Sequence, residues 1–415
     1  MNAMEDLQSQ AAAYRGHPPV EVMTGYPPPA GSRVTPENWF KLPYLRWSLM
    51  NRSLSVPTVD VWRGAGPVSA LSVGPALPED VKVTGLDGKP APLLDHLRSL
   101  EVDGLLVMHD GAIVFERYFH GMRPQMRHGT ASVSKSFLGV VAGVLAHQGV
   151  LDFSRQASYY VPEMRGAAMG GATLQQLLDM QAGIVRPSLD GRPGNLGPQD
   201  GGVYEILGLL PRRPAAPDNF YDFVLQKPAS GEHGQKLYYD NGPPEALAWT
   251  IRRATGRPIA ELLSELVYQP LGPERDAFYS VDPTGAEFTA GGLAMTMRDM
   301  ARFGELLRNQ GSWNGRQVVP QSFIDDLHHG GNRAFHAESR FAAANPGGAY
   351  RNYFHVDGGR WQGLCAHGRY GQRIYASTKA KLVVAQFGAA PGTSPHPFEV
   401  PIARLHAELA DLLNG

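Results

Sequence analysis

One stretch of the chain joins a reactive pair of side chains to a helix that has to be buried. Ser132 and Lys135 lie three residues apart, and the run 137–146 after them contains only apolar residues and glycine. This run predicts a helix that begins near Val133 and ends at Gly149, a residue type that favours helix ends. Because its surface is apolar on almost every side, the helix must lie inside the protein with other elements packed around it.

The same helix gives the Ser132 and Lys135 pair a chemical meaning. Residues three apart share a helix face, so the Lys135 amine reaches the Ser132 hydroxyl. Burial disfavours the ammonium and lowers the pKa of a lysine, which can then act as a base. The helix N-terminus adds backbone N–H groups where negative charge develops. Chance alone produces such a pattern in a chain of this length, but no other lysine here has a serine three positions before it.

The composition excludes several classes of function. Lys and Arg total 38 against 39 for Asp and Glu, so no basic excess favours nucleic acid. The single cysteine, Cys365, rules out an internal disulfide and fits a reducing compartment. The N-terminus lacks the apolar core of a signal peptide, and no stretch is long and apolar enough to span a membrane. We therefore expect a cytoplasmic protein whose partner is a small molecule.

Strand and helix signals together predict an α+β fold. Apolar runs on both sides of Asp110-Gly111 predict a β-hairpin, and three more strands are expected within 364–387. Helical patterns dominate the middle of the chain, and an amphipathic helix over 400–413 closes it. Strands at both ends with helices between them favour a sheet lobe and a helical lobe.

The expected organisation has two parts. Residues 1–92 are rich in proline and glycine but also in aromatic residues, so we expect an arm that packs on the body, with a short helix near 36–50. Residues 93–415 form the main domain. Its sheet lobe is expected from about 93–165 and 281–415, and its helical lobe from about 166–280. The segment 183–217 is expected to be a long, loop-rich stretch of the kind that lines sites.

Two further motifs suit the chemistry of a serine nucleophile. In Tyr239-Asp240-Asn241, a phenol near a lysine can pass a proton to a leaving group, and an asparagine can hold a carbonyl. In Ala366-His367-Gly368, a small residue after an apolar strand lets substrate approach a backbone N–H that stabilises an oxyanion. Each motif also has a plain structural alternative, because Asp-Asn-Gly is common turn chemistry and the second motif fits an ordinary strand and turn.

The order and spacing of the three motifs resemble those found in the serine β-lactamase and penicillin-binding superfamily. The chain is most similar to the class C β-lactamase-like branch of esterases and amidases, and within it to the 6-aminohexanoate-dimer hydrolases. The stretches that carry this closer likeness are 132–136, 160–163, 177–181, 247–249 and 371–372. The resemblance covers residues from about 90 to the C-terminus. It implies an antiparallel sheet flanked by helices, a mostly helical lobe, and an active site between them.

The resemblance also implies roles for individual residues. Ser132 would be the acylated nucleophile, Lys135 its base and Tyr239 the proton shuttle to the leaving group. The backbone N–H groups of Ser132 and Arg369 would form the oxyanion hole. The other residues expected to contact substrate are Asn241, Gly368, His367 and Ala290. Neither a metal nor a cofactor is implied.

Several residues that differ from the family pattern narrow the range of substrates that we expect. Ala366-His367-Gly368 stands in place of Lys-Thr-Gly, so no lysine holds the carboxylate of a β-lactam. The acidic, tyrosine-containing loop of the dimer hydrolases is replaced by 182–187, where Ala182 and Ile184 would face the substrate, and Ala290 replaces an asparagine. We expect hydrolysis of small carboxylic esters, and also of amides including 6-aminohexanoate oligomers. The alternatives are a D-amino-acid peptidase, a weak β-lactamase or a penicillin-binding-like sensor without turnover, and a homodimer also stays open.

The remaining candidate residues favour structural roles. His328, His329 and His336 do not have the spacing of a usual metal-ligand set and suit the end of a surface helix. Cys365 lies beside the strand that is proposed to contribute to the oxyanion hole. We interpret it as a small buried residue of that strand and not as a nucleophile. The chain has no Gly-x-Ser-x-Gly motif, which argues against an α/β-hydrolase.

Overall fold

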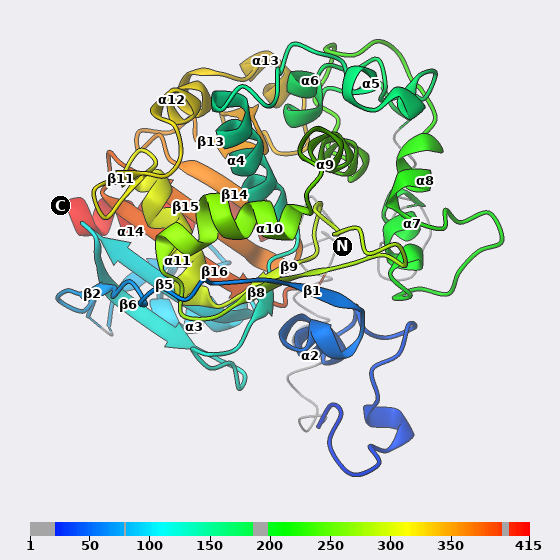
Figure 1. Cartoon of the computed structure of the whole chain (residues 1–415). Coiled ribbons are helices and arrows are strands. Elements are labelled where there is room, and N and C mark those ends of the chain that lie inside the picture. The colour runs from blue at the N-terminus through cyan, green and yellow to red at the C-terminus, as the bar shows by residue number, and fades with distance from the viewer. Residues whose placement is uncertain (1–20, 79, 186–197, 392–397) are drawn as a thin grey trace.

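A large sheet forms the base of the fold in the computed structural model, which describes residues 21–78, 80–185, 198–391 and 398–415 (Figure 1). Neighbouring strands pair antiparallel, except that β2 pairs in parallel with β6. In spatial order the strands are β12 (Ala349–Arg351), β13 (Phe354–Val356), β14 (Leu364–Gly368), β15 (Gln372–Ser377), β16 (Leu382–Gly388), β5 (Val102–His109), β6 (Ala112–Tyr118) and β2 (Ser72–Val73). The predicted hairpin and the three predicted C-terminal strands are confirmed.

The central strand β5 shows why this sheet is buried on both faces. Successive side chains of a strand point to opposite sides. Leu106 and Met108 belong to the core cluster around α4, whereas Leu105 and Val107 belong to a second cluster that includes residues of α3 and α14. The turn into β6 is closed by Gly111, whose φ of +82° suits a residue without a Cβ.

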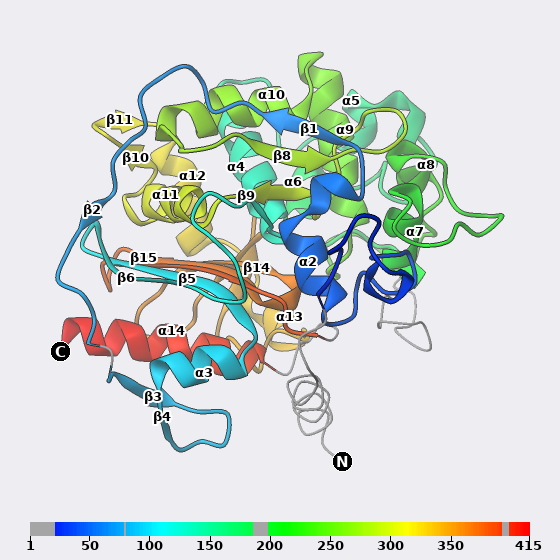
Figure 2. The same ribbon diagram turned by 90° about the horizontal axis from the view of Figure 1, so that it is seen from below.

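Helices cover both faces of the sheet (Figures 1 and 2). On one face lie α3 (Leu93–Ser99) and α14 (Glu399–Asn414), and on the other lie α4 (Val133–His147) and α11 (Met297–Arg308). Thr296 caps α11 by accepting a hydrogen bond from the Asp299 N–H at 3.2 Å. The chain thus forms the predicted α+β layers, with the Ser132 helix enclosed between the sheet and the rest of the helical region.

The predicted burial of this helix is confirmed, because every residue of α4 from 133 to 145 is buried. Two glycines allow its neighbours to approach closely. A Cβ on Gly139 would lie 2.4 Å from the Asn352 carbonyl oxygen, and one on Gly143 would lie 2.4 Å from the Phe323 ring. Contacts to β14 and β15 on one side and to α9 and α10 on the other hold α4 in place.

A second, four-stranded antiparallel sheet ties the N-terminal segment to the body. Its order is β1 (Thr58–Val61), β8 (Ala277–Ser280), β9 (Leu293–Met295) and β7 (His128–Gly129). Helix α2 (Tyr44–Met50) is anchored by Arg46, which forms buried ion pairs with Glu101 at 2.8 Å and with Asp103 at 2.5 Å. The described part of the expected arm therefore supplies strands and a buried ion-pair anchor. The division of the chain into an arm and two lobes stays a prediction.

The remaining elements surround α4 and the large sheet. The helices are α5 (Ala157–Tyr160), α6 (Leu174–Leu178), α7 (Pro198–Ile206), α8 (Phe220–Leu225), α9 (Gly242–Thr255), α10 (Ile259–Leu263), α12 (Gln321–His329) and α13 (Arg333–Ala337). Two small hairpins pair β3 (Lys82–Thr84) with β4 (Pro90–Pro92), and β10 (Ser312–Trp313) with β11 (Arg316–Gln317). Across the described ranges, no helix has the length and apolar character needed to cross a bilayer.

The prediction of a loop-rich segment over 183–217 is wrong in part, because α7 lies within it. Val203 and Ile206 of this helix are buried in a cluster with Trp39 and Phe220. Packing against distant residues therefore outweighs the glycine content of this segment, which disfavours a helix locally. Residues 186–197 of the predicted loop lie outside the described residues.

Candidate active site

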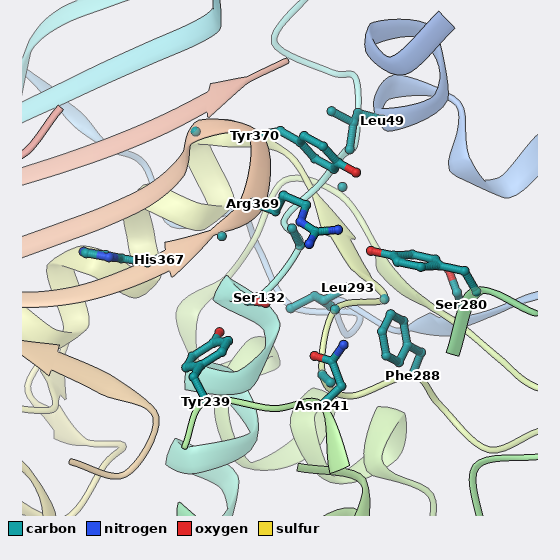
Figure 3. A pocket seen from close by; sticks show the side chains of 18 of the residues that line it. Leu49, Ser132, Tyr239, Asn241, Ser280, Phe288, Leu293, His367, Arg369 and Tyr370 are labelled. Carbon is teal, nitrogen blue, oxygen red and sulfur yellow. The ribbon is translucent and has the colours of Figure 1, made fainter. Parts of the chain in front are cut away.

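Ser132 lies at a sharp corner between β7 and α4. The preceding residue, Ala131, has a φ of +47°, a left-handed conformation that alanine rarely adopts. Thr130 braces the corner, since its N–H and its hydroxyl both donate to the Leu293 carbonyl oxygen at 2.9 Å. The corner places the Ser132 side chain in a pocket at the N-terminal end of α4 (Figure 3). Such local strain is often found at functional sites.

Lys135 is held against Ser132 by a set of short hydrogen bonds. Its Nζ atom donates to Ser132 Oγ at 3.0 Å, to Asn241 Oδ1 at 2.9 Å and to the Ala290 carbonyl oxygen at 2.6 Å. An ammonium group has three N–H donors for these three acceptors, whereas a neutral amine that accepts the Ser132 hydroxyl proton keeps two, for Asn241 and Ala290. The lysine is only 1% exposed, so these contacts fix its position in a site closed to bulk water.

The Tyr-x-Asn motif lies beside this lysine, as the sequence predicts. Figure 3 shows Tyr239 and Asn241 on one side of Ser132, with the Tyr239 hydroxyl directed toward the serine. Lys135 Nζ lies 5.0 Å from the centre of the Tyr239 ring. Asp240 between them points away into a buried ion pair with Lys227 at 2.7 Å and accepts from the Gly242 N–H at 2.7 Å. This ion pair sets the turn, and sequence reasoning missed Lys227.

The third motif ends β14 and contacts the chain just before the nucleophile. A Cβ on Gly368 would lie 2.4 Å from the Thr130 carbonyl oxygen, so only glycine fits at this point. Arg369 follows, and Figure 3 shows its side chain in the pocket across Ser132 from Tyr239 and Asn241. The structure therefore brings together the two backbone segments from which the oxyanion hole is expected.

His367 differs from the other predicted site residues. Its ring points away from Ser132 in Figure 3 and stacks on His355, with 4.0 Å between ring centres. Burial lowers the pKa of His367 well below its usual value, and His355 lowers it further. A neutral, stacked imidazole turned away from the serine packs the strand end, although it still lines the pocket.

Ala290 holds Lys135 in position through its backbone, and Glu245 in turn holds the backbone of Ala290. Sequence reasoning treats Ala290 as a lost side chain, but its backbone oxygen accepts from Lys135 and its N–H donates to Glu245 Oε1 at 2.8 Å. The Thr289 hydroxyl donates to the same oxygen at 3.1 Å. Glu245 is 2% exposed, and burial raises its pKa to about 7 although Arg252 lowers it. An acid among apolar residues in the first turn of α9 is the signal that points to Glu245.

Apolar side chains make up much of the pocket wall. Leu49 reaches the pocket from α2, and Leu207 and Leu209 reach it from the chain after α7. Phe288 and Leu293 complete this surface from the loop before β9 and from the start of that strand (Figure 3). Sequence reasoning missed Leu49 and Leu207, because no local pattern links these segments to Ser132.

The segment after α6 is expected to contact the substrate, but its described residues, 182–185, do not line the pocket. Ala182 and Ile184 are buried in the core cluster around α4 and do not line the described pocket. Gly183 between them receives structural hydrogen bonds, since its N–H donates to His233 Nδ1 at 2.9 Å and its carbonyl accepts from the Ser230 N–H at 2.9 Å. The expectation that Ala182 and Ile184 face the substrate is therefore wrong. Arg186 and Pro187 lie outside the described residues.

The other polar candidates are dispersed. His328 and His329 end α12, and His336 is buried in α13, where it lies edge-on to His355. Among the residues that the structure describes, no group of three or more His, Cys, Asp or Glu side chains could hold a metal ion. Cys365 is a free thiol on β14, and burial raises its pKa well above the usual value. These properties suit packing more than nucleophilic chemistry.

Comparisons with known proteins agree with this geometry. The Beta-lactamase family model matches residues 95–408. The 6-aminohexanoate-dimer hydrolase of Paenarthrobacter ureafaciens is 29% identical over 375 residues, which cover 88% of this chain and 91% of that protein. Esterase EstB of Burkholderia gladioli is 27% identical over 169 residues, covering 39% and 41%. A solved structure from Bacillus anthracis, assigned as a 6-aminohexanoate-dimer hydrolase, has a TM-score of 0.85 at 32% identity and covers 93% of this chain and 98% of its own.

The family model includes most of the residues that line the pocket, but not Leu49. The family model spans all three motifs, from Ser132 to Gly368. The structural relative extends further and takes in much of the N-terminal segment that the family model leaves out. The chain therefore belongs to the beta-lactamase family, and in sequence and fold it is similar to the 6-aminohexanoate-dimer hydrolases.

Proposed function

We propose that this protein is a serine hydrolase that forms an acyl-enzyme at Ser132 and cleaves small carboxylic esters, with amides as poorer substrates. The observation that carries the proposal is the 3.0 Å contact between Lys135 Nζ and Ser132 Oγ, in a lysine fixed by Asn241 and Ala290. A nucleophile and a base within hydrogen-bond reach, with the base oriented by further groups, are the parts that nucleophilic catalysis needs.

In the acylation step, neutral Lys135 takes the proton of the Ser132 hydroxyl as Oγ attacks the substrate carbonyl carbon. The C=O electron pair moves to the carbonyl oxygen, and the N–H groups of Ser132 and Arg369 stabilise the resulting oxyanion. Tyr239 delivers a proton to the leaving oxygen or nitrogen as its bond to carbon breaks, and the proton held by Lys135 then passes to Tyr239, so that the Lys135 amine is neutral again. A water molecule then attacks the acyl-enzyme by the same sequence, releasing the acid and restoring Ser132.

Esters are favoured over amides because an amine leaves poorly. An amide needs firm protonation and hydrogen bonds to its N–H, whereas an activated ester needs mainly the nucleophile and the oxyanion hole. Ala290 offers no side-chain group for such a bond, and the nearby wall contains Leu49, Phe288 and Leu293. The D-amino-acid peptidase, weak β-lactamase and sensor readings remain the alternatives. The cytoplasmic location and the homodimer stay predictions.

The test uses Ser132→Ala with a fluorophosphonate probe and p-nitrophenyl butyrate. We expect loss of labelling and a fall in kcat/KM of at least about 10³-fold, with an unchanged fold. Ser280→Ala is the matched control, because it removes a different serine hydroxyl from the lining of the same pocket and should keep labelling. Labelling of Ser132→Ala would refute the assignment, and labelling of the wild type without turnover of any ester would favour the sensor.

A further inference from the structure

Arg52 is a partly buried cation in the wall of the Ser132 pocket. It follows α2 in the short 3-10 helix Arg52–Leu54. Its guanidinium stacks over the Trp39 ring, 5.0 Å from the ring centre. Arg52 makes no side-chain hydrogen bond or ion pair with any residue that the structure describes, and its Nη1 atom is closed off from solvent.

An unpaired guanidinium in such a place is unfavourable. Arginine has five N–H donors and stays charged, so burial without acceptors costs free energy. Burial lowers the pKa of Arg52, and only the hydroxyls of Tyr204 and Tyr370 oppose this effect. A structural arginine is normally matched by a carboxylate, as Arg46 is by Glu101 and Asp103 on the same segment. Arg52 is therefore built to meet an acceptor that is not part of the described chain.

The rest of the pocket has the same electrostatic character. Arg340, Arg369 and Arg373 line it together with Arg52, against two acids, Asp240 and Glu399. Asp240 is already neutralised by Lys227 at 2.7 Å. Arg373 donates to two backbone carbonyl oxygens, those of Gly368 at 2.9 Å and Gln372 at 2.8 Å. The described lining thus has an excess of positive charge, which attracts anions and disfavours cations.

We propose that Arg52 binds a carboxylate of the substrate, so that the preferred substrates are esters or amides that carry a second, free carboxylate. This proposal rests on the hydrolase function proposed above and specifies its substrate class. A planar guanidinium offers two parallel N–H groups that match the two oxygens of a carboxylate. Leu49, Leu207 and Leu209 line the same pocket and would contact the methylene chain that joins the carboxylate to the reacting carbonyl. Monoesters of dicarboxylic acids have this form.

The kinetic test compares substrates that differ by a carboxylate on either side of the scissile bond. Mono-p-nitrophenyl adipate against p-nitrophenyl hexanoate places it on the acyl side, and 4-acetoxybenzoate against phenyl acetate places it on the leaving group. In the wild type, we expect the carboxylate to raise kcat/KM about 10- to 100-fold in one pair, mainly through KM, as expected for a charge-assisted hydrogen bond.

Arg52→Met should remove this preference, and Arg52→Lys should keep part of it. Lys41→Met is the matched control, because Lys41 is an exposed cation of the same segment that does not line the pocket, and it should keep the wild-type ratios. Equal kcat/KM within both pairs of substrates for the wild type would overturn the proposal. So would a carboxylate preference that survives in Arg52→Met.

A binding measurement separates this proposal from the proposed function. Adipate, which has no bond to hydrolyse, should raise the Tm of the wild type and of Lys41→Met but not of Arg52→Met. Without adipate, Arg52→Met should be at least as stable as the wild type, because it removes an unpaired, partly buried charge. A lower Tm together with unchanged adipate binding would mean that Arg52 is structural, which overturns the proposal. Arg52-dependent adipate binding without any ester hydrolysis would support the carboxylate site and reject the hydrolase.

Discussion

Replacing Glu245 by glutamine should make the free energy of unfolding of the protein less sensitive to pH. Glu245 is buried beneath Lys135, and its Oε1 atom accepts hydrogen bonds from the Ala290 N–H and the Thr289 hydroxyl. Glutamine has the same shape and keeps an oxygen for both bonds, but it cannot ionise. Oε2 has no hydrogen-bond partner among the described residues. The substitution therefore removes the titration of Glu245 while preserving its contacts.

The sign follows from the two pKa values of Glu245, 4.5 when unfolded and about 7 when folded. Because the folded protein binds this proton more tightly, the favourable contribution is complete below pH 4.5 and is lost as the pH rises through about 7. A difference of about 2.5 between the two pKa values corresponds to about 3 kcal/mol. The Glu245→Gln protein does not lose this contribution as the pH rises. Its free energy of unfolding should therefore increase by about 3 kcal/mol relative to that of the wild type as the pH rises from 4.5 to above 7.

Urea unfolding of both proteins between about pH 4.5 and pH 8 measures this difference directly. Every other titrating group, including Asp179 with its raised pKa of about 6, is present in both proteins and cancels in the comparison. Glu261→Gln, at an exposed position of α10, is the control for exchanging a carboxyl group for an amide. A difference between Glu245→Gln and the wild type that does not change with pH would show that burial does not raise the pKa of Glu245.

Two further predictions concern the chemistry. Lys135→Ala should abolish acylation, and Tyr239→Phe should lower kcat by roughly 10²–10⁴, the usual size of a general acid–base contribution; stopped-flow release of p-nitrophenol measures both, and wild-type rates in either variant would contradict the assigned role. The kcat/KM for p-nitrophenyl acetate or butyrate should lie well above that for the linear 6-aminohexanoate dimer in a parallel assay of amine release. A better rate with the dimer would mean that residues outside the described pocket lining supply contacts to the amide.

The parts of the fold predicted from sequence are those with a strong local signal. The run 137–146 can only be a buried helix, and alternation around Asp110-Gly111 specifies the hairpin with its turn. The three motifs come together because Ser132 and Asn241 both begin buried helices and Gly368 ends a strand packed against them.

The parts that could not be predicted depend on contacts between distant segments. Helix α7 is rich in glycine, and the buried cluster that retains it contains Trp39 from the N-terminal segment. Leu49 and Arg52 reach the pocket only because α2 is anchored through Arg46 to Glu101 and Asp103. No periodicity or motif in the N-terminal segment records that anchor.

Ala290 shows a second reason why a site cannot be fully predicted from its side chains. An alanine in place of an expected asparagine suggests a group that has been lost. In the structure, however, the backbone of Ala290 links two titratable side chains: its oxygen accepts from Lys135 and its N–H donates to Glu245. Any residue type except proline can supply these two backbone groups, so the sequence around Ala290 does not reveal this role. The backbone of Ala290 therefore helps to position the lysine, and its small side chain lines the pocket beside Ser132.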